Sequence, residues 1–179
     1  MLTVTLNHSG QHFNVPQSWE EIRLGDYEKW LCKAPATRIE QVNMLADLCR
    51  ISPDTLLESP AQLFELLADT LHFIFEETCD VPNNRIEMDG QTYGVGAGDE
   101  ITLAEWVDIE AIFEAGSQSR LSEILAVLCR PLGEAYDSKQ CESRQSAFAA
   151  LTMDKAMPLL AFFCFQAKNL RRFRAFVCK

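Results

Sequence analysis

The chain has few of the residues that most often act in catalysis or bind metals. Its 179 residues include only three histidines, and no two of its seven cysteines form a C-x-x-C pair. Because a structural zinc site needs clustered Cys and His ligands, we predict no metal ion and no cofactor. The first residues lack a basic start followed by an apolar run, so no secretory signal is expected. An odd cysteine count then favours reduced, mostly buried thiols in a cytoplasm.

Long apolar runs are also missing. The nearest is MPLLAFFCF, residues 157–165, which is shorter than the roughly 20 residues that a membrane-spanning helix needs. We expect this run to be part of a buried helix and the protein to have no membrane partner.

Acidic residues are absent from the end of the chain. The net charge is -10, but no Asp or Glu follows Asp154, while the last 25 residues hold six basic side chains. A net acidic chain is a poor general nucleic-acid binder, because phosphate contacts need a basic surface. The terminal run KNLRRFRAFVCK is the exception, since basic residues alternate there with apolar ones at helical spacing. The candidate partner-binding residues are Lys168, Arg171, Arg172, Phe173 and Arg174.

Three interpretations of this basic terminus remain open. It is a last helix packed by its apolar face, with cations favoured at its C-terminus by the helix dipole. Alternatively it docks on an acidic protein, including the acidic remainder of another copy. In the third interpretation it contacts nucleic acid, which is possible for this protein only through the basic C-terminus.

Short patterns recur about 80 residues apart in the same order. GQHFNV is matched by GQTYGV, EIRLGDY by EITLAEW, and LADLCR by LAVLCR. Collinear matches at a nearly constant offset indicate an internal duplication. We predict a first repeat over residues 1–80 and a second over residues 81–179, packed as one globular unit. Cys49 and Cys129 occupy equivalent places and are expected to be buried.

The hydrophobic pattern predicts a mainly α (α+β) fold. Each repeat is a β-hairpin followed by three helices, and the whole is a compact helical bundle with two small β-ribbons. Asp89-Gly90 suits a two-residue primed turn, and Thr102 with Glu105 forms a capping box at a helix start. The expected strands span residues 2–6, 11–15, 85–88 and 91–95. The expected helices span residues 24–31, 37–50 and 60–77 in the first repeat, and 120–129 and 154–177 in the second, which also has one that starts after Thr102. Residues 143–151 are expected to form one more helix in the second repeat, beside these three.

No motif indicates a reaction. His8 and His12 flank a hairpin turn and are expected to be exposed, while His72 lies in an apolar run and is expected at the core or its boundary. The acidic residues are spread along the chain, and nothing ties them to one pocket. GVGAG, residues 94–98, lacks the Lys-Ser/Thr ending of a phosphate-binding loop and the βαβ context of a dinucleotide site. We therefore expect no enzyme.

Two stretches resemble a known family. VPQSWEEIRLGDY in the first half, and EITLAEWVDIE followed by ILAVLCRPLGEAYD in the second, resemble phage tail-assembly chaperones and related baseplate-hub assembly proteins. The resemblance covers residues 15–27 and 101–137. It implies a phage-encoded, non-enzymatic protein that binds tail, baseplate or neck proteins in the host cytoplasm, with self-association possible. It transfers no catalytic residues.

Two rival functions remain. The first is a structural virion component, such as a neck, tail or internal capsid protein, that is retained in the particle. The second is a small cytoplasmic enzyme, which a deep polar pocket joining His72 to a cysteine would favour.

Overall fold

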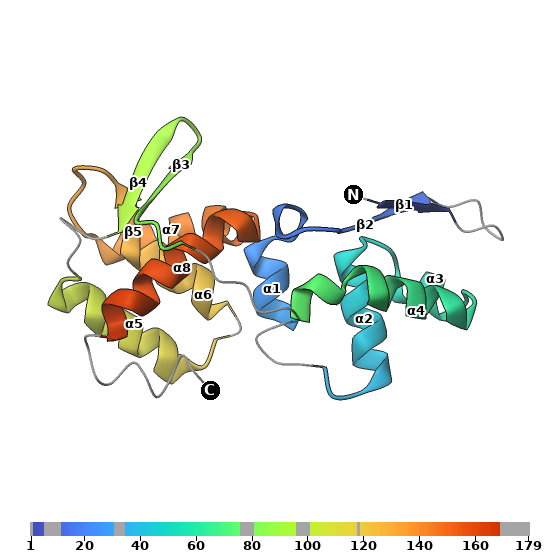
Figure 1. The fold of residues 1–179 in the computed structure, drawn as a ribbon. Coiled ribbons are helices and arrows are strands. Elements are labelled where there is room, and N and C mark those ends of the chain that lie inside the picture. Colours follow the sequence, from blue (N-terminus) through green and yellow to red (C-terminus); the bar gives the residue numbers. More distant parts are fainter. Residues whose placement is uncertain are drawn as a thin grey trace.

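The fold is mainly α with two small antiparallel sheets, as the sequence predicts (Figure 1). It is seen in a computed structural model that describes residues 2–5, 12–30, 35–75, 81–95, 101–117 and 119–168. Helices α2, α3 and α4 lie at one end of the molecule and α5 lies at the other.

The first half begins with the expected hairpin. β1 and β2 pair antiparallel, with Leu2 opposite Val15. A short 3₁₀ turn and the helices follow. The elements are β1 (Leu2–Thr5), β2 (His12–Val15), η1 (Trp19–Glu21), α1 (Leu24–Trp30), α2 (Arg38–Leu48), α3 (Pro53–Leu57), α4 (Ala61–Thr70) and η2 (His72–Phe75).

The long helix expected over residues 60–77 is wrong from Leu71 to Phe75, and residues 76 and 77 lie outside the described residues. There α4 ends with Leu71 as its C-cap, and the chain tightens into η2. Leu71 and Ile74 are buried whereas His72 between them is exposed, so the 3₁₀ turn places both apolar side chains in the core. Helix α3 was not expected, although Ser52 caps it by accepting a hydrogen bond from the Thr55 N–H at 3.1 Å.

The second half repeats the hairpin and adds a third strand. Asp89 and Gly90 have φ of 51° and 75°, which confirms the primed turn between β3 and β4. The elements are β3 (Arg85–Met88), β4 (Gln91–Val95), α5 (Leu103–Ala115), α6 (Arg120–Leu128), β5 (Cys129–Pro131), α7 (Ser138–Ala149) and α8 (Met153–Lys168). The short β5 was missed because its CRP sequence has no alternating pattern; it pairs with β4 at Tyr93 to Val95.

Two further boundaries differ from expectation. Helix α7 begins at Ser138, five residues early, because Asp137 caps it by accepting from the Lys139 N–H. Helix α8 begins at Met153, one residue early, and Pro158 lies in its second turn. The expected helix over residues 154–177 is confirmed as far as Lys168, and its remainder lies outside the described residues.

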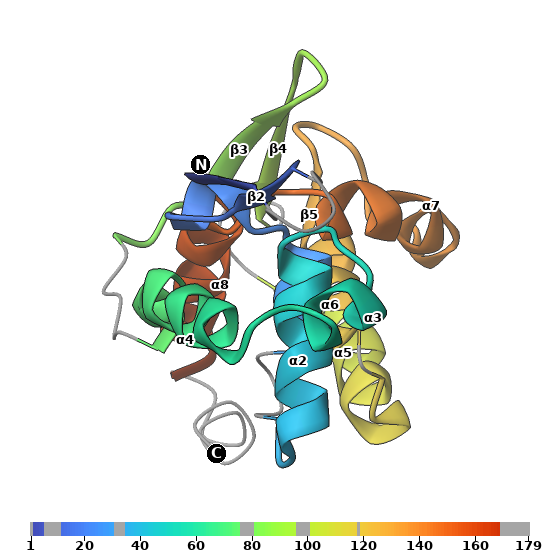
Figure 2. The same ribbon diagram turned by 90° about the vertical axis from the view of Figure 1, so that its right-hand side faces the viewer.

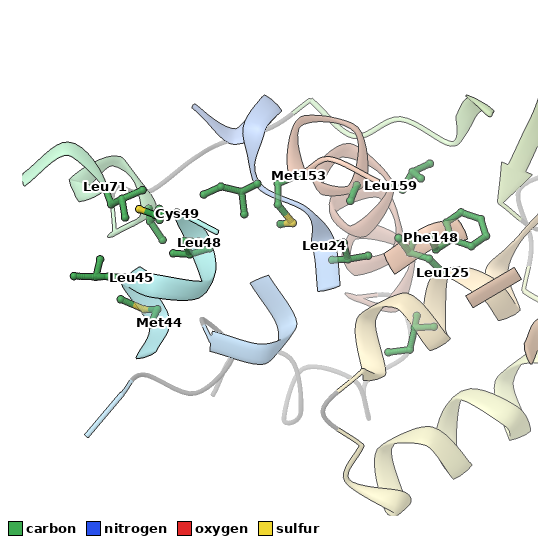
Figure 3. Close-up of a cluster of buried hydrophobic side chains, with 14 of the residues drawn as sticks. Leu24, Met44, Leu45, Leu48, Cys49, Leu71, Leu125, Phe148, Met153 and Leu159 are labelled. Carbon is green, nitrogen blue, oxygen red and sulfur yellow. The ribbon is translucent and has the colours of Figure 1, made fainter. Parts of the chain in front are cut away.

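Helix α1 joins the two halves. The chain entering it forms a β-bridge between Arg23 and Thr152, at the start of α8. The Leu24 N–H donates to the Leu151 carbonyl, and the Met153 N–H donates to the Ile22 carbonyl, each at 2.8 Å. The buried apolar cluster runs through both halves, with Leu24 and Met153 near its middle (Figure 3). It includes Met44, Leu45, Leu48, Cys49, Leu71, Leu125, Phe148 and Leu159.

Candidate protein-binding surfaces

An acid–arginine pair occurs at matching positions in the two halves. In the first half, Arg50 at the end of α2 pairs with Asp26 of α1 at 2.5 Å. In the second half, Arg130 after α6 pairs with Glu105 of α5. Each partner in the second pair lies 79 or 80 residues after its counterpart, which is the offset of the sequence repeat. The first pair is partly exposed, whereas the Arg130 and Glu105 side chains are 3% and 0% exposed.

The buried pair belongs to a larger polar network. The Thr102 hydroxyl donates to Glu105 Oε2 at 2.7 Å, and the Arg130 Nε–H donates to the Glu134 carbonyl at 2.9 Å. The Tyr136 hydroxyl donates to Asp108, and both burial and this hydrogen bond raise the pKa of Tyr136. Four of these residues carry the family resemblance, namely Thr102, Asp108, Arg130 and Tyr136. Thr102 and Arg130 both bond Glu105, whereas Tyr136 bonds Asp108 and its ring centroid lies 6.0 Å from the Arg130 guanidinium. We call this set of contacts the clamp, because it holds α5 to the chain that follows α6.

A second buried carboxylate fastens α1 to the second half. Glu28 is 5% exposed, and its two oxygens accept from the Ser122 N–H at 2.5 Å and the Ser122 hydroxyl at 2.9 Å. Burial raises the pKa of Glu28, while the hydrogen bonds from Ser122 oppose that rise. Ser122 lies in the first turn of α6, where N–H groups lack helical partners. Glu28 therefore caps a helix of the other half.

A polar cleft of about 480 Å³ lies beside this contact. Its walls include Glu28 and Lys29 of α1, Ser119 and Ser122 near the start of α6, and Gln145 and Ala149 of α7. The Lys29 ammonium pairs with Asp47. Since both Glu28 oxygens already accept from Ser122, this carboxylate is held as a cap and is not aimed at a substrate.

An apolar groove of about 510 Å³ lies between α2, α3 and α4. These helices face the viewer in Figure 2. We define the groove by Val42, Leu56, Leu57, Phe64, Arg38, Glu65 and Asp69. Leu57 is 54% exposed, and the Arg38 guanidinium lies 4.6 Å from the centroid of the Phe64 ring. The floor is therefore apolar and the rim is charged, which suits a protein segment better than a small polar substrate.

Helix α5 carries an uncovered apolar surface, which we call the α5 stripe: Leu103, Ala104 and Val107. Leu103 is 78% exposed and Val107 is 53% exposed. Positions i, i+1 and i+4 lie on one side of a helix. Only part of the apolar surface of α5 packs inward, with Ile109 fully buried. The α5 stripe is thus available to another molecule.

The partner-binding residues predicted at the C-terminus stay a prediction. Lys168 ends α8, and Arg171, Arg172, Phe173 and Arg174 lie outside the described residues.

The histidines do not form a site in the part of the chain that the structure describes. His12 is exposed, as expected, with Nδ1 2.8 Å from the Thr5 hydroxyl. His72 is exposed rather than at the core, because its neighbours in η2 take the buried positions. His8 lies outside the described residues.

The buried thiols are poor nucleophiles. Cys49 and Cys129 are buried, as predicted, and burial raises the pKa of each to about 12. Burial also raises the pKa of Cys141. Because the thiolate is the reactive form, Cys49 and Cys129 are largely inert at neutral pH. Among the described residues, no three metal-ligating side chains are grouped, and no helix is long and apolar enough to cross a membrane.

Sequence reasoning missed Glu28, the groove and the exposure of the α5 stripe. One signal was present, because aligning EIRLGDY with EITLAEW sets Leu24 against Leu103 and, one residue beyond, Glu28 against Val107. A charged residue that aligns with an apolar one indicates a surface whose chemistry differs between the two halves.

Comparison with protein-family models, curated proteins and solved structures finds no match to this chain.

Proposed function

We propose that this protein is a non-enzymatic phage morphogenesis factor, a chaperone or adaptor that binds tail or baseplate components during virion assembly in the host cytoplasm. The observation that carries the proposal is a pair of uncovered apolar surfaces, the groove and the α5 stripe, at opposite ends of the molecule (Figure 1). An adaptor needs at least two binding surfaces, and apolar ones supply most of the binding energy of protein interfaces.

The state of the charged residues supports a binding role. Glu105, Arg130 and Glu28 are buried and already paired or hydrogen-bonded, so they hold the helices in place. The phage assignment itself rests on the resemblance carried by residues 15–27 and 101–137. In the structure these pattern residues have structural roles, since Thr102 and Arg130 bond Glu105 and Tyr136 bonds Asp108.

The test is capture of tagged protein from phage-infected cells, with Val107→Glu as the surface variant. Val81→Glu is the matched control, because Val81 is 83% exposed and belongs to neither surface. We expect tail or baseplate proteins to be captured by the wild type and by the control, and to be lost with Val107→Glu. Capture of no phage protein by the wild type would refute the proposal.

Mass spectrometry of purified particles then separates a chaperone from a virion component. A chaperone is absent from the finished particle, whereas a neck, tail or internal capsid protein is retained in it.

A further inference from the structure

The contact between α1 and the second half of the same chain is a template for a contact between two copies of the chain. Helix α1 presents Leu24, Gly25 and Glu28 to the second half. Leu24 is fully buried, and a Cβ on Gly25 would lie 3.3 Å from the Ala149 carbonyl oxygen. Glu28 accepts the hydrogen bonds from Ser122.

The α5 stripe is the same face one repeat later. The repeat offset of 79 residues carries Leu24, Gly25 and Glu28 to Leu103, Ala104 and Val107. All three members of the stripe are exposed, with Leu103 at 78% and Val107 at 53%. A face that is covered on α1 is therefore open on α5.

The groove corresponds, one repeat earlier in the sequence, to the surface of the second half on which α1 packs. That surface includes Ser122, Gln145 and Ala149, and the offset of 80 residues carries them back to Val42, Glu65 and Asp69. All three counterparts line the groove. The cleft is closed on one side by Gly25, Glu28 and Lys29 of α1. Among the described residues, those that line the groove belong to α2, α3, α4 and the connection between α3 and α4.

The two sets of residues also match in chemistry. Within the chain, Glu28 accepts hydrogen bonds from Ser122, and Ser119 lines the same cleft. The counterparts of these serines on α2 are Ile39 and Val42, and Ile39 is 50% exposed. The counterpart of Glu28 is Val107. The polar Glu28 thus meets a polar residue inside the chain, whereas its apolar counterpart Val107 corresponds to the apolar Val42 of the groove.

We propose that α5 of one copy docks in the groove of a second copy, as α1 docks on the second half within each chain. This inference rests on the proposed function, in that it takes the two apolar surfaces to bind protein, and it names their partner. A chain cannot make this contact with itself, because α5 and the groove lie at opposite ends of the molecule (Figure 1). Copies therefore join head to tail, and such an interface builds open filaments or closed rings.

The test is sedimentation velocity of the full chain over a wide range of concentration. Val107→Glu disables the stripe, and Leu57→Glu disables the groove at an exposed position that lines it. We expect the wild type and the Val81→Glu control to form larger species as concentration rises. Each disabling variant alone loses all species larger than the monomer, with an unchanged far-UV circular dichroism spectrum.

Mixing the two disabling variants is the decisive step. Each retains one intact surface, so the mixture forms a 1:1 pair and nothing larger. A wild type that stays monomeric throughout, variants that associate as the wild type does, or a mixture that fails to pair would overturn the inference. Monomeric wild type that still captures tail proteins would overturn it while leaving the proposed function standing. Failure of both experiments would refute both.

Discussion

Removing one charge from the buried Glu105–Arg130 pair should destabilise the protein far more than the same change in the partly exposed Asp26–Arg50 pair. The two pairs occupy matching positions, so comparing them within one protein shows how burial changes the contribution of an ion pair to stability. Glu105→Gln keeps the side-chain length and the capping box, which tolerates Gln at this position. It leaves the Arg130 guanidinium, only 3% exposed, without a counter-charge at Glu105.

The expected magnitudes follow from exposure. Breaking a buried ion pair by removing one partner costs about 3 to 5 kcal/mol, since an uncompensated charge is left in a poorly solvated site. In the first half the Arg50 side chain is 56% exposed, so water solvates it when Asp26→Asn removes its partner. Partly exposed pairs of this kind contribute about 0 to 1 kcal/mol. The two variants should therefore differ by roughly 2 kcal/mol or more.

Urea unfolding followed by tryptophan fluorescence and far-UV circular dichroism measures both changes. Trp19 and Trp30 report on the first half and Trp106 reports on the second, so coincident transitions also show whether the halves unfold together. A thermal midpoint gives a second reading, with about 2 to 4 °C expected per kcal/mol for a chain of this size. A loss below about 1 kcal/mol for Glu105→Gln, or equal losses for both variants, would refute the reasoning.

Three more outcomes are expected. Burial raises the pKa of Glu28, so the folded state binds the proton of this carboxyl group more tightly than the unfolded state. The resulting contribution to the free energy of unfolding is fully present below the unfolded pKa and is lost as pH rises through the folded pKa. Glu28→Gln should flatten that part of the pH–stability curve, and an unchanged curve would contradict the assignment. Trp106→Ala and Tyr27→Ala, at matched half-buried positions, should each cost roughly 2 to 4 kcal/mol in urea unfolding, and a loss below about 0.5 kcal/mol at either would argue against equivalent halves. Iodoacetamide should label Cys49 and Cys129 only after unfolding, as read by peptide mass spectrometry, and rapid native labelling would show that these thiols are accessible.

Local signals in the sequence predicted most of the secondary structure. The Asp89-Gly90 turn and the Thr102 cap depend on neighbouring residues alone, and both are confirmed. The predictions from sequence were wrong where contacts between residues far apart in the chain determine the secondary structure. Helix α4 ends at Thr70 because the tighter turn that follows lets both Leu71 and Ile74 pack in the core. Strand β5 forms because its backbone pairs with the edge of β4.

The candidate surfaces were harder to predict for the same reason. Leu103 and Val107 have the spacing of a core face, and their exposure depends on what lies opposite them in the fold. The two-repeat division over residues 1–80 and 81–179 stays a prediction. It is supported by the recurrence of the acid–arginine pair in both halves. The arginine of each pair, Arg50 or Arg130, is the last residue of the matching segment, LADLCR or LAVLCR.

The difference between Glu28 and Val107 also determines which helix fits which surface. Were α5 to dock on the second half of another copy in place of α1, Val107 would leave the Ser122 N–H without its acceptor, at about 1 to 3 kcal/mol for an unsatisfied buried group. The Ser122 hydroxyl would keep the Ser119 carbonyl as its acceptor. Were α1 to enter the groove, Glu28 would bring a carboxylate against Val42 beside the acidic Glu65 and Asp69, which is unfavourable by desolvation and by like-charge repulsion. Each helix is thus selected for its own surface by the unfavourable contact that it would make at the other. A duplicated chain whose halves were identical would have no such selection, and its first and second repeats would compete for the same positions within and between copies.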